Sequence, residues 1–172
     1  MVNNNLSTQK GSDEIKTILY ATDLGDHTRP AFHMAVNLAK VYKAKMLFLY
    51  VIAPLSSTAM SAVNVYFPSE TLEEMNVVSM DEVTERAEKR IKEFCAEEIG
   101  DEELPGGELV PHIIEGMPAA TIVKTAETMD ADLVVMGNHG HGMLDTLFLG
   151  SVADKVVHNC SKPVLLVPIQ SG

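Results

Sequence analysis

Three glycines and a serine at fixed intervals form the part of this sequence best suited to chemistry. Gly137, Gly140, Gly150 and Ser151 follow the apolar stretch 133–136. Four apolar residues in a row, two of them β-branched, predict a short strand buried on both faces. Glycine lets the backbone come close to a ligand, and the free N–H groups at a helix start favour an anion. Strand, glycine loop and helix together predict a phosphate cradle.

The spacing of these residues decides which known type of phosphate-binding loop the sequence can match. A P-loop needs Lys and Ser or Thr directly after its last glycine, but Gly142 is followed by Met143 and Leu144. The order G-x-x-G-x-G, after the predicted fourth strand, also disfavours a Rossmann dinucleotide site. Ser151 is suited to cap the helix that starts here and to offer its hydroxyl. A glycine-rich connection that binds nothing stays open as the alternative.

Composition predicts a single globular domain. The chain has 172 residues, 46% of them hydrophobic, and a formal net charge of −11. We expect a loose polar tail over 1–13 and one α/β domain over 14–170. The acidic balance argues against nucleic-acid or anionic-membrane binding, yet a ring of backbone N–H groups can still hold ATP. No apolar run approaches a spanning length and no signal peptide is evident, so we expect a cytoplasmic protein.

Alternating apolar and amphipathic stretches predict the fold. The five predicted strands cover residues 16–21, 46–52, 109–114, 133–136 and 163–168. The four predicted helices cover residues 30–43, 70–99, 116–129 and 151–159. The charged residues of the second are expected to form a solvated face. This alternation predicts a doubly wound, five-stranded parallel sheet with helices on both faces. Pro111 places the third strand at an edge, which fits the strand order 3-2-1-4-5. Thr28 is a candidate cap for the first helix.

The predicted strand order brings separate sequence features together. Ligands of such sheets bind at the carboxyl ends of the strands where the order reverses, here between the first and fourth strands. Asp23 would then face Gly137 across a crevice, and Val51 would border it. A carboxylate after a strand also commonly stabilises the next turn, so Asp23 has two interpretations. Its place at the crevice favours the ligand role.

The pattern Gly137-x2-Gly140-x9-Gly150-Ser151 resembles the nucleotide-binding signature of the universal stress protein family, which has a Rossmann-like fold. The resemblance runs from residue 16 to 168 through the segments 21–23, 51–52 and 160–168. It implies a stress-response regulator that binds ATP. In nucleotide-binding members, the matching positions surround ATP. The implied contacts are Asp23 with adenosine, the Val51 backbone with adenine, Met136 and Gly137 with ribose, and Gly140, Gly150, Ser151 and Val152 with the phosphates.

The first-strand segment Ala21-Thr22-Asp23 and the loop residue His139 complete the candidate nucleotide-binding set. Some ATP-binding relatives have Pro in place of Ala21. His139 stands where Arg is frequent, so its contact with phosphate would depend on its protonation near neutral pH. The pair His139 and His141 has no third ligand at a recognisable spacing, so we assign no metal site. Mg²⁺ or Mn²⁺ would arrive with ATP, held mostly by the phosphates.

The sequence favours little or no ATP hydrolysis, and we assign no catalytic residue. The glycine loop contains no Lys or Arg to stabilise charge at a γ-phosphate, and Lys155 lies one turn into the helix. A dimeric interaction module without nucleotide and a weak ATPase are the alternative functions. We expect a homodimer through the edge strand Val164–Val167. The segment 53–69 is either a lid or an unstructured insertion. Cys95 and Cys160 are expected to be reduced and buried.

Overall fold

A computed structural model of the chain describes residues 14–25, 27–54, 80–100, 104–107, 109, 111–138 and 149–169. Its strands are β1 (Thr17–Thr22), β2 (Lys45–Ile52), β3 (Pro111–Glu115), β4 (Leu133–Gly137) and β5 (Val164–Val167). All of their pairings are parallel, in the order β3-β2-β1-β4-β5. The predicted fold class and strand order are therefore confirmed, with the Pro111 strand at one edge.

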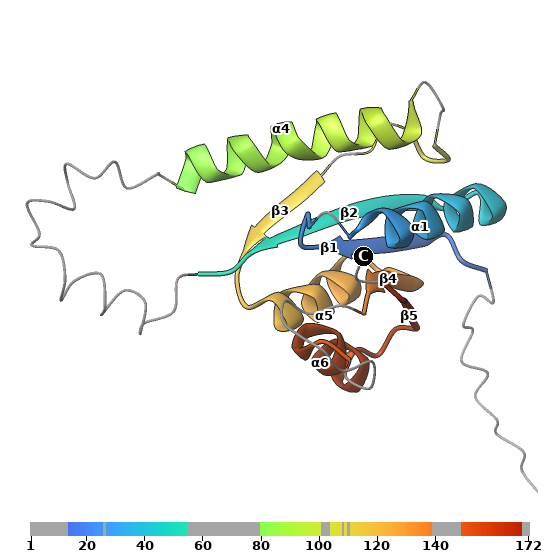
Figure 1. Cartoon of the computed structure of the whole chain (residues 1–172). Helices are drawn as coiled ribbons and strands as arrows, with labels where there is room; N and C mark the ends of the chain where they lie inside the picture. Colours follow the sequence, from blue (N-terminus) through green and yellow to red (C-terminus); the bar gives the residue numbers. More distant parts are fainter. Residues whose placement is uncertain are drawn as a thin grey trace, which may run out of the picture.

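Helices cover both faces of the sheet (Figure 1). Helices α1 (Arg29–Tyr42) and α4 (Met80–Ile99) lie on one face, and α5 (Pro118–Thr128) and α6 (Ser151–Asn159) lie on the other. Each strand runs so that its carboxyl end reaches the same edge of the sheet, as parallel pairing requires. This edge, called the carboxyl edge below, is the side on which Asp23 and Gly137 lie.

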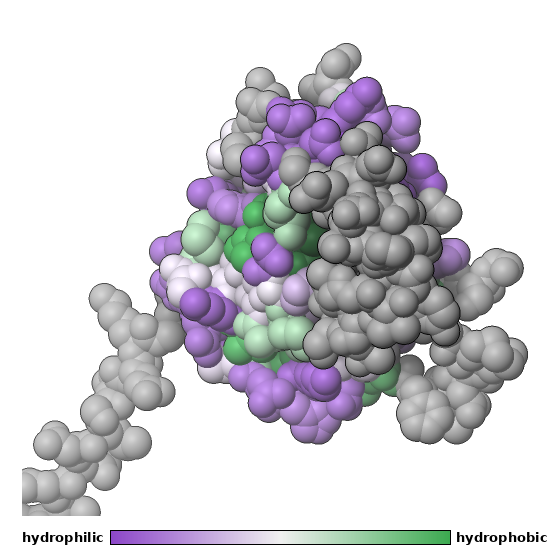
Figure 2. Space-filling model, turned by 90° about the vertical axis from the view of Figure 1, so that its left-hand side faces the viewer, coloured by the Kyte–Doolittle hydropathy of each residue, from purple (hydrophilic) through white to green (hydrophobic). Residues whose placement is uncertain are grey.

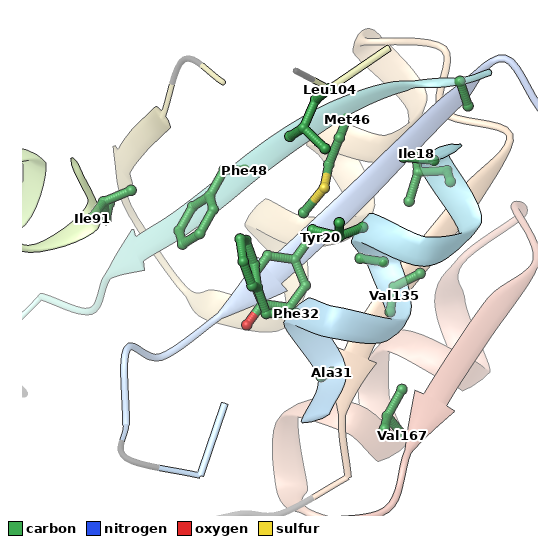
Figure 3. Packing of buried hydrophobic residues seen from close by; sticks show 14 of the residues in the cluster. Ile18, Tyr20, Ala31, Phe32, Met46, Phe48, Ile91, Leu104, Val135 and Val167 are labelled. Atoms are coloured by element: carbon green, nitrogen blue, oxygen red, sulfur yellow. The ribbon is translucent and has the colours of Figure 1, made fainter. Parts of the chain in front are cut away.

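The larger apolar core lies between the sheet and the α1/α4 face. Tyr20, Phe32 and Phe48 meet there, with ring centroids 5.1 Å apart for Tyr20 and Phe48 and 5.5 Å apart for Tyr20 and Phe32 (Figure 3). Phe94 of α4 packs on Phe32 at 4.8 Å. Such edge-on aromatic contacts add to the stabilisation from burial itself. The Tyr20 hydroxyl donates to the Thr28 carbonyl at 3.3 Å, and burial raises the pKa of Tyr20 to about 12.

Two sequence predictions about these helices need correction. Thr28 occupies the cap position of α1, but its hydroxyl donates to the Gly25 carbonyl at 2.9 Å and accepts no helix N–H. The charges of α4 were expected to form a solvated face. Glu98 departs from this, because its side chain is only 12% exposed and pairs with both Arg29 and His33 of α1. Charge pairing between the two helices covers part of the Glu98 side chain at the protein surface.

Several predictions fall outside the described ranges. These are the tail 1–13, most of the segment 53–69, and the first part of the helix predicted from residue 70. None of the helices in the described ranges is long and apolar enough to cross a membrane.

Candidate functional site

The carboxyl ends of β1 and β4 lie side by side. Ala21 is in register with Met136 of β4, and on its other side with Leu49 of β2. Asp23, immediately after β1, therefore emerges beside the end of β4, where Gly137 is the last strand residue. The sequence prediction that these two strand ends are neighbours is confirmed by the sheet order.

Four of the candidate residues share one face of the sheet. Ala21 and Met136 are buried in the core cluster under α5 and α6, and Val51 and Val152 pack against the same cluster. They come from β1, β4, β2 and the start of α6, which the topology brings to one corner of the carboxyl edge. These side chains therefore hold the ends of β1, β2 and β4 and the start of α6 together at that corner.

The turn after β1 has a tightly specified backbone. The Leu24 N–H donates to the Thr22 hydroxyl at 3.1 Å, and the Gly25 N–H donates to Oδ1 of Asp23 at 3.0 Å. The Asp23 carboxylate thus does stabilise the next turn, which was one of its two interpretations. Leu24 has a φ of 58°, a left-handed conformation that costs a residue with a Cβ about 1 kcal/mol. Asp23 itself is exposed at the carboxyl edge.

The end of β4 is tied to the start of α6. The Asn138 N–H donates to the Val167 carbonyl at 3.1 Å, and the Gly150 N–H donates to the Asn138 carbonyl at 3.2 Å. The Asn138 side chain accepts a bond from the Ile169 N–H at 3.1 Å. These bonds bring the two ends of segment 139–148 together, although that segment, with His139 and Gly140, lies outside the described residues.

The first turn of α6 presents backbone donors at this corner. Gly150 is the cap residue and Ser151 the first residue of the helix, so the prediction that Ser151 caps it is wrong. The first helical bond runs from the Asp154 N–H to the Gly150 carbonyl at 2.9 Å. The amides of Ser151, Val152 and Ala153 precede that bond and have no acceptor within the helix. The partial positive charge at a helix start favours an anion there.

Figure 2 faces the carboxyl edge of the sheet. It shows apolar residues at the surface among polar ones. Ile114 and Met117, at the end of β3 and just beyond it, are 36% and 65% exposed. Leu149, directly before α6, is 44% exposed. Among the described residues, no group of three or more His, Cys, Asp or Glu is placed to hold a metal ion. The described part of this edge therefore combines apolar surface, the exposed carboxylates of Asp23 and Glu115, and helix-start amides.

The sequence profile of the universal stress protein family matches residues 14–168 of the chain. The chain belongs to the universal stress protein family. Universal stress protein MJ0531 of Methanocaldococcus jannaschii is 32% identical over 161 residues, covering 92% of this chain and 85% of that protein.

Solved structures of the family agree with the fold. The structure of MJ0577, from the same organism, is 27% identical with a TM-score of 0.60, covering 92% of this chain and 99% of that one. A universal stress protein in complex with cAMP has a TM-score of 0.55 and 22% identity, covering 91% of this chain and 99% of that one. The latter likeness establishes a shared fold alone.

The structure of this universal stress protein gives Gly137 a role that the sequence did not predict. A Cβ added at Gly137 would overlap the end of the Ile169 side chain, which lies over this backbone position. Val167, which pairs with Gly137, belongs to the core on the α1 side of the sheet. The absence of a side chain at Gly137 therefore makes room for Ile169. The resemblance had assigned Gly137 only to a ligand.

Two further residues of this universal stress protein have structural roles that the sequence did not predict. Asn138 joins β4, β5 and α6 through the three bonds described above, and its place between two glycines of the signature was the available clue. Arg90, in the middle of α4, donates from Nη2 to the Leu24 carbonyl at 2.8 Å. Nothing in the local sequence distinguishes Arg90 from the other basic residues of α4, because its partner lies 66 residues away.

Proposed function

We propose that this protein binds an adenine nucleotide, specifically ATP, at the carboxyl edge between β1 and β4. ATP would act as a conformational ligand of a stress-response regulator. The observation that carries this proposal is the bond from the Gly150 N–H to the Asn138 carbonyl, at 3.2 Å. It sets the start of α6 against the end of β4, beside the strand end that leads to Asp23. The amides proposed to bind phosphate would then lie at the end of β4, next to β1, whose end leads to the carboxylate proposed for the nucleoside.

The parts of the nucleotide would meet different elements. We assign the phosphates to Gly140 of the glycine signature and to Gly150, Ser151 and Val152 at the start of α6, where free amides favour an anion. Protonated His139 would add a cation to that group. Mg²⁺ or Mn²⁺, held mostly by phosphate oxygens, would reduce the charge repulsion with an acidic protein.

The nucleoside would lie toward β1 and β2. We assign adenosine to Asp23 with Ala21 and Thr22, adenine to the Val51 backbone, and the ribose to Met136 and Gly137. Supporting this half of the proposal, the side chains of Ala21, Val51 and Met136 share one apolar cluster at that corner. The cAMP complex of a universal stress protein with the same fold supports the choice of an adenine nucleotide.

We propose that hydrolysis is slow or absent. Rapid phosphoryl transfer requires a cation or a positioned base near the γ-phosphate. Among the described residues around the start of α6, the nearest cationic side chain in sequence is Lys155, which is exposed and one turn into the helix. A bound ATP would then persist and stabilise one conformation of the protein.

We further propose a homodimer through β5. Within the described residues β5 is an edge strand, and its pairing with β4 uses the carbonyls of Pro163 and Val167. By the alternation of a strand, the backbone groups of Val164 and Leu166 point away from β4. Antiparallel pairing with a second copy across a twofold axis would satisfy them. This edge also supports the second candidate function, a dimeric interaction module that binds no nucleotide.

Mass spectrometry of the freshly purified, denatured protein tests the proposal. We expect released adenine nucleotide, and after reloading with Mg-ATP we expect little or no phosphate in a phosphate-release assay. Gly140→Val should copurify with little nucleotide while its thermal unfolding matches that of the wild type, which separates loss of the site from loss of the fold. No nucleotide on the native protein together with no binding of added Mg-ATP would favour the interaction module instead.

A further inference from the structure

The turn that carries Asp23 does not hold its shape by local bonds alone. Leu24 has a φ of 58° although it has a Cβ. A residue held in this sparsely populated region needs surrounding contacts that fix it. The Leu24 side chain is buried in the core under α1 and α4, and its N–H is bonded to Thr22. Its carbonyl is the remaining backbone group, and it accepts from α4.

Arg90 supplies that bond, with Nη2 2.8 Å from the Leu24 carbonyl oxygen in a partly buried position. A pocket of about 180 Å³, lined by Gly25, Thr28 and Phe94 among others, lies between the turn and α4. The Arg90 side chain, which also lines this pocket, therefore connects the turn and the helix by a directional bond. A bond from a charged donor is stronger than one between neutral groups.

The helix that carries Arg90 is anchored independently of the turn. Ile91 is buried in the core, and Phe94 packs on Phe32 of α1. Glu98 pairs with Arg29 and His33 of α1. With α4 fixed by these contacts, the Arg90 guanidinium has a defined position from which to hold the Leu24 carbonyl.

From these contacts we infer that Arg90 is a positioning residue for the nucleotide site and couples α4 to nucleotide occupancy. This inference rests on the proposed function. Arg90 fixes the Leu24 carbonyl, Leu24 fixes the turn, and the turn sets the direction of Asp23 at the carboxyl edge. Because coupling between two positions is reciprocal, a nucleotide that orders Asp23 also strengthens the attachment of α4.

Calorimetric titration of Mg-ATP into the full chain tests the first half of the inference. Arg90→Gln should bind Mg-ATP about tenfold more weakly than the wild type, the effect of losing one charge-assisted bond. Arg90→Lys, which keeps a cationic donor, should recover most of that loss. Lys89→Gln is the control, since it removes the same charge one residue earlier, where Lys89 pairs only loosely with Glu93 at 3.8 Å. It should bind like the wild type.

Hydrogen exchange tests the second half, and its wild-type measurement does not depend on whether a variant folds. Saturating Mg-ATP should slow exchange of the α4 amides around residues 87–95 in the wild type and in Lys89→Gln, but not in Arg90→Gln. If the wild type binds Mg-ATP but Arg90→Gln and Lys89→Gln bind it with equal affinity, the inference is overturned and the nucleotide site stands. The same holds if Mg-ATP leaves the exchange of the α4 amides unchanged in the wild type. Failure of the wild type to bind Mg-ATP would instead overturn the proposed function.

Discussion

The backbone N–H of Gly150 donates to the carbonyl oxygen of Asn138 at 3.2 Å, so the residues that flank segment 139–148 are hydrogen-bonded to each other. This bond fixes the start of α6 at the end of β4. It therefore joins a helix start to the strand pair β1 and β4, at the point where the order of the sheet reverses.

Leu166→Pro should convert dimers to monomers without unfolding the chain. The Leu166 N–H points away from β4, so proline there removes a bond to a second copy but none within the sheet. Leu166→Ala is the control, because it shortens the same side chain and keeps the N–H. Light scattering after size exclusion should give half the mass for the proline variant only. A dimer that persists in Leu166→Pro would argue against pairing through β5.

Gly137→Ala should destabilise the protein by about 1 kcal/mol, since the new Cβ would overlap the Ile169 side chain. In an Ile169→Ala background the same change should cost less, because the overlapping atoms are gone. Urea unfolding of the four proteins in this cycle measures the coupling. If the two changes proved additive, Gly137 would owe its identity to something other than Ile169.

Glu98→Gln should lower stability at pH 7 by about 0.5–1 kcal/mol, the range of a paired surface carboxylate. Hydrogen bonds from Arg29 and His33 lower the pKa of Glu98 below its ordinary value of 4.5. A carboxylate with a lowered pKa stabilises the folded state above its unfolded pKa and loses that effect as pH falls through the folded pKa. The stability difference between wild type and variant should thus shrink below pH 4.5 in urea titrations. A difference independent of pH would contradict the ionic pairing.

Cys95 should react slowly with iodoacetamide at pH 8. Burial raises the pKa of its thiol from 9.0 to about 11, so its thiolate fraction at this pH falls from roughly 10% to roughly 0.1%. In a Cys160→Ser protein, labelling should be about 100-fold slower in the folded than in the urea-unfolded state, and faster as the pH rises. Equal labelling rates in both states would show that burial does not protect the thiol.

Much of the fold followed from the sequence because its signals are local. Continuous apolar stretches predicted the central strands, and Pro111 predicted the edge position of β3. The neighbouring ends of β1 and β4 then followed from the strand order. The glycines after residue 136 indicated where β4 ends, because glycine commonly interrupts a regular element.

The features that could not be predicted depend on long-range contacts. Arg90 and the Leu24 carbonyl are 66 residues apart. Every residue has a backbone carbonyl, so the residue type does not reveal which one accepts this bond. Ile169 lies two residues beyond the end of β5, and its side chain packs over Gly137 at the end of β4. The predicted cap of α6 was Ser151, one residue after the observed cap Gly150. Glycine and serine are both common at the N-cap position, so residue type did not distinguish them.

Calorimetric titration of Mg-ATP into the wild type, Ser151→Asn and Ser151→Asp tests the nucleotide site most directly. Asp at the first position of α6 favours the helix, because its charge complements the dipole, but it repels a phosphate bound there. We predict binding by the wild type, binding within about threefold by Ser151→Asn, and a loss of at least about tenfold in Ser151→Asp, with no loss of thermal stability. Equal affinity in Ser151→Asp, or no heat from the wild type up to millimolar ATP, would contradict a phosphate site at the start of α6.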